Sequence, residues 1–225
     1  MSYKHWRSYS QGKKRLDSLK RVMISRIPGL CGVVGPLLIL SVTLIAISQY
    51  DSFSWTENWL SDLGVDQDAV AALFNLGLII CGALTAIFAI GLKGTLPRST
   101  RGSVGAITLF LGALALCSAG AFRSTVGVEY LVHYYTSGLF FALVIISLLL
   151  IGSAMMQEPS ERNLGLFVFI TGLFTCTAGI ALVVIDELSP WGGAIPEFLI
   201  SLGASVCYII LGVRLFKRTP HKVRG

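Results

Sequence analysis

Long apolar runs separated by short polar segments make up most of the chain. Six of these runs are uncharged or nearly so, and each reaches the roughly 20 residues that a helix needs to cross about 30 Å of hydrocarbon. They lie at about 28–49, 72–92, 103–122, 132–156, 164–185 and 196–216. Runs of this length predict an all-α integral membrane bundle of six transmembrane helices.

The segments between the runs are too short to hold a second folded domain. We therefore divide the chain into a basic N-terminal tail at 1–27, one transmembrane domain at 28–216 and a basic C-terminal tail at 217–225. The composition agrees, since 54% hydrophobic and 13% charged residues, with a mean hydropathy of +0.73, exclude an ordinary soluble domain with a charged surface.

The Lys and Arg residues lie almost entirely on one side of the predicted bundle. Of the 18, 17 fall in the two tails, at the ends of the runs beside them, and in the connections at 93–102 and 157–163, whereas Arg123 falls on the other side. Because Lys and Arg in short loops stay cytoplasmic, this bias predicts cytoplasmic termini in a multi-pass protein of the cell membrane. The net charge of +6 is explained by topology, so we expect no nucleic-acid partner.

The basic N-terminal tail also has an amphipathic segment, KKRLDSLKRVMISRI, at 13–27. Its apolar residues recur on one helical face, and basic side chains surround that face. This pattern favours an interfacial helix that binds anionic lipids of the cytoplasmic leaflet, with about 1 kcal/mol from each nearby Lys or Arg. The alternative is a disordered tail whose charges only set the topology.

The first connection holds an unusual acidic stretch, ENWLSDLGVDQD, at 57–68. Local helix chemistry explains much of it. Ser54 and Glu57 have the spacing of a capping box for one short helical turn, and Gly64 suits the end of that turn. Asp66 or Asp68 can cap the second span, where a carboxylate favours the positive end of the helix dipole. Asp62 is not explained this way, and we expect it to contribute more than a cap.

The predicted topology brings polar residues from several connections to one membrane level. These residues are Ser61, Asp62, Asn75, Arg123, Glu129, His133, Asp186 and Glu197. We expect them to line an outward-facing pocket. A titratable ring near a helix end, with carboxylates close by, can bind a head group, relay protons or assist hydrolysis. We further expect His133 to interact with at least one carboxylate among Asp62, Glu129 and Glu197.

The candidate residues do not match a metal or cofactor site. Zinc sites draw three or four ligands from His, Cys and carboxylates, whereas this set offers one His and no Cys. All five cysteines lie within the spans at scattered spacing, which is typical of packing residues. The sequence also contains no P-loop, Rossmann or haem-attachment motif. We therefore expect no metal and no cofactor.

Short motifs in and before the spans resemble a known family. They are the G-x-x-G-P element at 32–36, Ser-Asp-Leu-Gly at 61–64, Phe-Asn-x-Gly at 74–77, and the third span leading to His133. The chain resembles the prokaryotic multi-pass membrane family of unknown function DUF998 over about 28–216. More distantly, its Ser-Asp-x-Gly element resembles the Frag/DRAM/Sfk-type six-span proteins, which are linked to membrane-lipid organisation. Arg123 departs from the Pro-containing turn expected in such relatives. The resemblance implies a fold and no established reaction.

Three function classes stay open. The first is a noncatalytic membrane protein whose outer pocket binds a lipid head group or a partner, and membrane lipids are the partners we expect. The second is a lipid hydrolase or transferase that uses His133 with Asp62 or Glu197, although no nucleophile-elbow motif is present. The third is a proton-coupled carrier, although no charged residue lies at the middle of a span. The oligomeric state is not predicted.

Labelling of single introduced cysteines tests the topology. With both termini cytoplasmic, Ser52→Cys lies outside the cell and Ser99→Cys lies inside. An impermeant thiol reagent applied to intact cells is expected to label position 52 and not position 99. Labelling at 99 but not at 52 would overturn the assignment.

Overall fold

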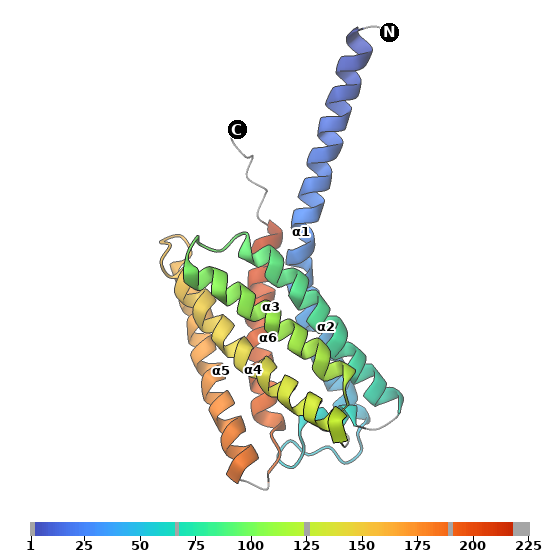
Figure 1. Ribbon diagram of the computed structural model, residues 1–225, viewed down its shortest axis with the longest axis vertical. Helices are drawn as coiled ribbons and strands as arrows, with labels where there is room; N and C mark the ends of the chain where they lie inside the picture. The colour runs from blue at the N-terminus through green and yellow to red at the C-terminus, as the bar shows by residue number, and fades with distance from the viewer. Residues whose placement is uncertain (1–2, 66–67, 124–126, 189–190, 218–225) are drawn as a thin grey trace.

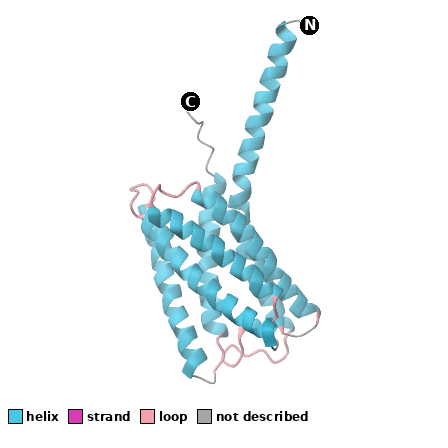
Figure 2. Ribbon diagram, in the orientation of Figure 1, coloured by secondary structure: helices cyan, strands magenta, loops and turns pink. Residues whose placement is uncertain are grey.

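The computed structural model contains only helices, turns and loops in the residues that it describes, which are 3–65, 68–123, 127–188 and 191–217 (Figure 2). The elements in chain order are α1 (Tyr3–Gln49), the short 3-10 helix η1 (Leu60–Gly64), α2 (Ala69–Lys93), α3 (Thr100–Ala121), α4 (Gly127–Met155), α5 (Arg162–Leu188) and α6 (Ala194–Lys217). All six α-helices include a segment long and apolar enough to cross a membrane. The predicted all-α, six-span class is confirmed.

The six helices form a closed ring. Each helix packs against its neighbours in sequence, and α6 closes the ring by packing against α1. Both described ends of the chain lie at the same end of the bundle, here called the terminal end; the opposite end, which carries η1, is called the η1 end (Figure 1). Large buried side chains such as Phe88, Leu148 and Leu211 fill the centre of the ring.

Two helix boundaries differ from the sequence prediction in an informative way. The α4 helix begins at Gly127, five residues before the predicted start of its span at 132, so Glu129, which was expected in the preceding connection, lies in the first turn of the helix. The α1 helix is continuous from Tyr3, so residues predicted as a separate tail extend the first span and project beyond the bundle (Figure 1). Pro28 and Pro36 lie inside this unbroken helix.

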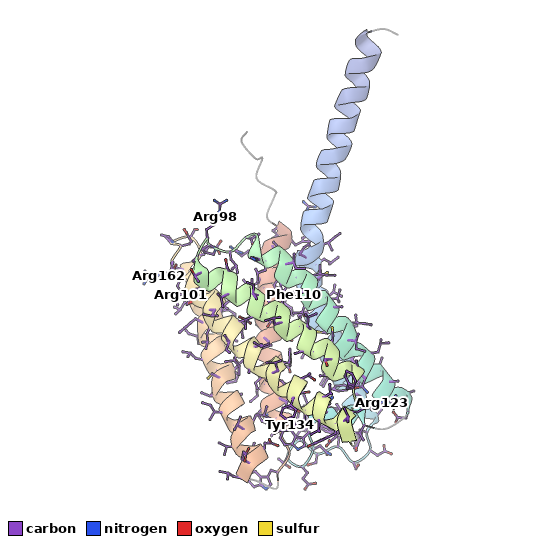
Figure 3. The ribbon with its side chains drawn as sticks, in the orientation of Figure 1. Arg98, Arg101, Phe110, Arg123, Tyr134 and Arg162 are labelled. Carbon is purple, nitrogen blue, oxygen red and sulfur yellow. The ribbon has the colours of Figure 1, made fainter. Side chains whose placement is uncertain are left out.

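Charged residues are separated between the two ends of the bundle. Arg98, Arg101 and Arg162 lie at the terminal end, whereas Arg123 lies towards the η1 end (Figure 3). Also near the terminal end, Arg214 of α6 forms an ion pair with Glu161, which precedes α5. The structure therefore places the basic connections together, as the sequence predicted.

The contact between α4 and α5 changes along its length. Near the terminal end the two backbones touch, because a Cβ built on Gly152 would lie 2.5 Å from the backbone nitrogen of Phe169 and 2.8 Å from the carbonyl oxygen of Gly165. Further along, only the Ile145 side chain lies within reach of Gly179. A Cβ on Gly138, nearer still to the η1 end, would meet nothing within 4 Å. The two helices thus diverge towards the η1 end (Figure 1).

This arrangement predicts opposite effects for two identical substitutions in α4. Gly152→Ala forces a methyl group into the backbone of α5 and is expected to destabilise the protein by about 1–3 kcal/mol. Gly138→Ala enters open space and is expected to be neutral or to stabilise the helix by up to about 1 kcal/mol, because Ala favours helix over Gly. Thermal unfolding in detergent compares the two variants. Equal losses would show that the backbone contact at Gly152 is not close.

Candidate functional site

The connection between α1 and α2 folds through side-chain hydrogen bonds that the sequence did not fully predict. The backbone nitrogen of Ser54 donates to Asn58 Oδ1 at 2.9 Å, whereas Glu57 is exposed. The predicted capping box between Ser54 and Glu57 is therefore wrong. The short helix begins instead at Leu60, and it ends at Gly64 as expected.

Two aspartates of this connection cap helices, one the short helix η1 within the connection and the other α2 after it. Asp62 Oδ2 accepts hydrogen bonds from the Trp59 backbone nitrogen and from Asn58 Nδ2, both at 2.9 Å, and so caps the start of η1. Asp68 Oδ1 accepts from the backbone nitrogen of Ala71 at 2.7 Å, which confirms that Asp68 can cap the second span. Asp66, the alternative cap, lies outside the described residues.

Long-range hydrogen bonds join this connection to the start of α6. The backbone nitrogens of Gly192 and Ala194 donate to the carbonyl oxygens of Thr56 and Asn58 at 2.9 and 3.0 Å. Gly192 is required there, because a Cβ would collide with the backbone of Asn58. The connection therefore lies directly against α6.

Glu197 completes this junction from inside the bundle. Its side chain is only 6% exposed, and its Oε2 accepts a hydrogen bond from the buried backbone nitrogen of Leu60 at 2.7 Å. Oε1 has no hydrogen-bond partner among the described residues. Burying a carboxyl group costs free energy unless its oxygens are hydrogen-bonded. Oε1 is therefore available to bind another partner.

His133 is 5% exposed, and its ring is anchored by the end of α3. Its Nδ1 lies 2.9 Å from the carbonyl oxygens of both Ala119 and Phe122. A nitrogen that faces two carbonyl oxygens must carry the proton, so the ring satisfies carbonyl groups that the end of α3 leaves unpaired. In the neutral ring, Nε2 is then a hydrogen-bond acceptor. The expected contact with a carboxylate is not present: no described carboxylate lies within 4.0 Å of the ring nitrogens.

A cleft of about 580 Å³, here called the lateral cleft, opens between α4 and α5 at the η1 end. Its α4 wall includes Tyr134, Gly138 and Leu139, and its α5 wall includes Leu182 and Val183. The polar part of its lining consists chiefly of Trp59, Ser61, Asp62, Tyr130, His133, Tyr134, Ser137, Asp186 and Glu197. The divergence of α4 from α5 thus creates an opening on the side of the bundle.

A smaller cavity of about 90 Å³, here called the inner cavity, lies behind the lateral cleft in the centre of the ring. Ser61, His133 and Glu197 line both spaces, so they stand at the boundary between them. Deeper in the ring, Tyr208 lines the inner cavity, and its buried hydroxyl has no hydrogen-bond partner of normal geometry among the described residues. The polar boundary therefore lies between the lateral cleft and the inner cavity.

The predicted site residues divide into two groups. Ser61, Asp62, His133, Asp186 and Glu197 all line the lateral cleft. Three others do not line either space. Asn75 is buried and donates from Nδ2 to the carbonyl oxygen of Gly64 at 2.9 Å, which makes it an anchor for η1. Arg123, half-buried, follows the end of α3, and Glu129 is exposed in the first turn of α4.

The tyrosines of the cleft are not among the site residues predicted from the sequence. Tyr134 donates from its hydroxyl to Asp186 Oδ2 at 2.7 Å and so links α4 to α5 across the cleft. Tyr130 stacks on Tyr134, with ring centroids 6.1 Å apart. The segment EYLVHYY at 129–135 holds the signal, since three tyrosines surround the candidate histidine. Among the described residues, no three metal-binding side chains lie close enough together to hold a metal ion.

The hydrogen bond between Glu197 and Leu60 can be tested by two substitutions. Glu197→Ala leaves a buried backbone donor without an acceptor and is expected to cost about 1–3 kcal/mol of unfolding free energy. Glu197→Gln keeps a carbonyl oxygen at the same place and is expected to retain most of the stability. Unfolding of both variants in detergent provides the comparison. Equal losses would show that the charge, and not the hydrogen bond, holds η1 against α6.

Comparison with known proteins places this fold in a family. No curated protein and no solved structure gives a significant match. A family model described as "Protein of unknown function (DUF998)" matches residues 33–214, which include most of the described bundle and every described residue of the lateral cleft. The chain is therefore a multi-pass membrane protein that belongs to the DUF998 family.

Proposed function

We propose that the protein binds a membrane lipid in the lateral cleft, with the head group against the polar residues at the η1 end. The observation that carries this proposal is the side opening between two membrane-spanning helices. A lipid can enter such a cleft sideways from the bilayer, without first passing into water. The volume of about 580 Å³ is within the usual range for small-molecule sites, roughly 300–1,000 Å³.

The distribution of polar and apolar residues supports the same proposal. Towards the middle of the bundle the cleft is lined by apolar groups such as Leu139, Phe141 and Ala142. Towards the η1 end it is lined by Asp62 and Asp186. A lipid is likewise apolar at one end and polar at the other. Its acyl chains therefore fit the apolar region of the cleft, and its head group fits the polar region.

Catalysis is less well supported than binding. A nucleophile is activated by a hydrogen bond to its general base, whereas among the described residues no hydroxyl or thiol side chain is hydrogen-bonded to the ring of His133, whose Nδ1 is held by backbone carbonyl oxygens. A proton-coupled carrier needs ionisable groups along a path. Beyond Glu197 and His133, the described residues that line the inner cavity are neutral at pH 7. Of the three functions, lipid binding is therefore the one that the groups present in the site support best.

We also propose an orientation and a second lipid contact. The basic residues near the terminal end favour a cytoplasmic location for that end, so that the lateral cleft opens to the outer leaflet of the cell membrane. The basic residues of 1–27 then lie on the cytoplasmic side, where they can bind anionic lipids.

A bulky residue at Gly138 tests lipid binding. Gly138→Phe places a ring in the open cleft, where a Cβ meets nothing within 4 Å, so the helix is expected to fold normally. The measurement is the phospholipid retained per protein after washing in mild detergent, determined by mass spectrometry. Wild-type protein is expected to retain several-fold more lipid than the variant.

Ile146→Phe is the matched control, because Ile146 is an exposed residue of α4 that does not line the lateral cleft. It adds an aromatic ring to the same helix and is expected to leave lipid retention unchanged. If Gly138→Phe retains as much lipid as Ile146→Phe, the lateral cleft is not the binding site.

A further inference from the structure

We propose that the lipid bound in the lateral cleft has a primary ammonium head group, as in phosphatidylethanolamine. This inference rests on the proposed lipid binding and specifies which class of lipid is bound. It follows from the polar side-chain atoms of the cleft that make no hydrogen bond within the fold.

The ionisable groups at the polar end of the lateral cleft have free acceptors. Asp62 and Asp186 each use Oδ2 in hydrogen bonds, and among the described residues neither Oδ1 has a partner. Glu197, which is more than nine-tenths buried, uses Oε2 and leaves Oε1 unpartnered. His133 is equally buried and presents Nε2 as an acceptor when neutral, because its Nδ1 donates to carbonyl oxygens.

The complementary ligand is therefore a cation with several hydrogen-bond donors. No Lys or Arg is present among the described residues that line the cleft, so a purely anionic head group finds no opposite charge there. A primary ammonium has three N–H donors and one positive charge, which match the free acceptors and compensate the carboxylates. The phosphate of the same lipid can accept hydrogen bonds from neutral donors such as Ser61, Ser137 and the indole of Trp59.

Aromatic residues in the cleft raise the alternative of a quaternary ammonium such as choline. Proteins bind such groups with the faces of several aromatic rings. Here the rings of Tyr130 and Tyr134 stack on each other at an interplanar angle of 26°, and Tyr135 packs edge-on against Tyr134 at 78°. The faces of these rings pack against one another and do not surround a space for a cation. Choline also has no N–H group for the free acceptors.

The experiment compares lipids that differ only in the number of N-methyl groups. Wild-type protein is stripped of lipid in detergent, and displacement of a fluorescent phospholipid is measured with phosphatidylethanolamine, its mono- and dimethyl derivatives, and phosphatidylcholine, all with the same acyl chains. Affinity is expected to fall along the series by at least about tenfold overall, because donors to charged acceptors are lost while the charge is constant. Phosphatidylglycerol is expected to bind more weakly than phosphatidylethanolamine.

Neighbouring acidic residues of α5 provide matched variants. Asp186→Asn keeps an oxygen for the Tyr134 hydroxyl and removes the charge that faces the cleft, so it is expected to reduce the preference for phosphatidylethanolamine over phosphatidylcholine several-fold. Glu187→Gln removes an adjacent exposed charge that does not line the cleft, and it is expected to leave the preference unchanged.

Several outcomes would overturn the inference. Equal affinity along the methylation series, or tighter binding of phosphatidylcholine or phosphatidylglycerol, would exclude a primary ammonium while lipid binding itself stands. Equal competition by water-soluble glycerophosphoethanolamine would show that acyl chains add nothing and that the ligand is a soluble amine. Failure of every lipid to displace the probe, with Gly138→Phe indistinguishable from wild type, would instead remove the proposed lipid binding.

Discussion

The lateral cleft depends on the close contact of α4 and α5 at the terminal end. Where Gly152 faces Gly165, the absence of side chains lets the two backbones touch. Two straight helices that touch near one end and cross at an angle must separate at the other end, and larger side chains further along widen the gap. The cleft is therefore a consequence of helix packing, and it needs no special loop to form it.

The η1 end supplies the chemistry that the diverging helices leave open. The first connection of the chain packs on the start of α6 through backbone hydrogen bonds to Gly192 and Ala194. This junction places Asp62 and Glu197 at the base of the cleft, and α4 and α5 contribute His133 and Asp186 to its sides. Four separate parts of the chain thus provide the ionisable groups of one site.

These ionisable groups share a common arrangement. Asp62 caps η1, Glu197 holds Leu60, and His133 pairs with the end of α3, yet among the described residues each keeps one polar atom unpaired. A structural role and a binding role are compatible here, because a carboxylate or an imidazole has two polar atoms that point in different directions. The bonds that stabilise the fold also fix the orientation of the free atoms, which reduces the entropy lost when a ligand binds.

The features that depend on local interactions could be predicted from the sequence. The length of the apolar runs determines how many helices can cross a bilayer, and the positions of Lys and Arg place the basic connections at one end of the bundle. The cap at Asp68 is equally local, since it involves a residue three positions away. The capping box predicted at Ser54 was wrong, because Asn58 competes with Glu57 for the backbone N–H of Ser54. The sequence does not reveal which of the two side chains accepts this hydrogen bond.

The convergence of the site was decided only by the tertiary structure. The sequence by itself determined that Asn75, Arg123 and His133 lie near the same end of the bundle, because span lengths fix the level of each residue along the membrane normal. It did not determine their positions around the ring, which depend on how the glycine contacts rotate and tilt each helix. The same holds for Glu197 and Leu60, which are 137 positions apart and meet only because α6 closes the ring against α1. The position of a residue along the membrane normal depends on its own helix, whereas its contacts depend on how the whole bundle packs. For this reason only the structure shows that Asn75 anchors η1 and that His133 lines the cleft.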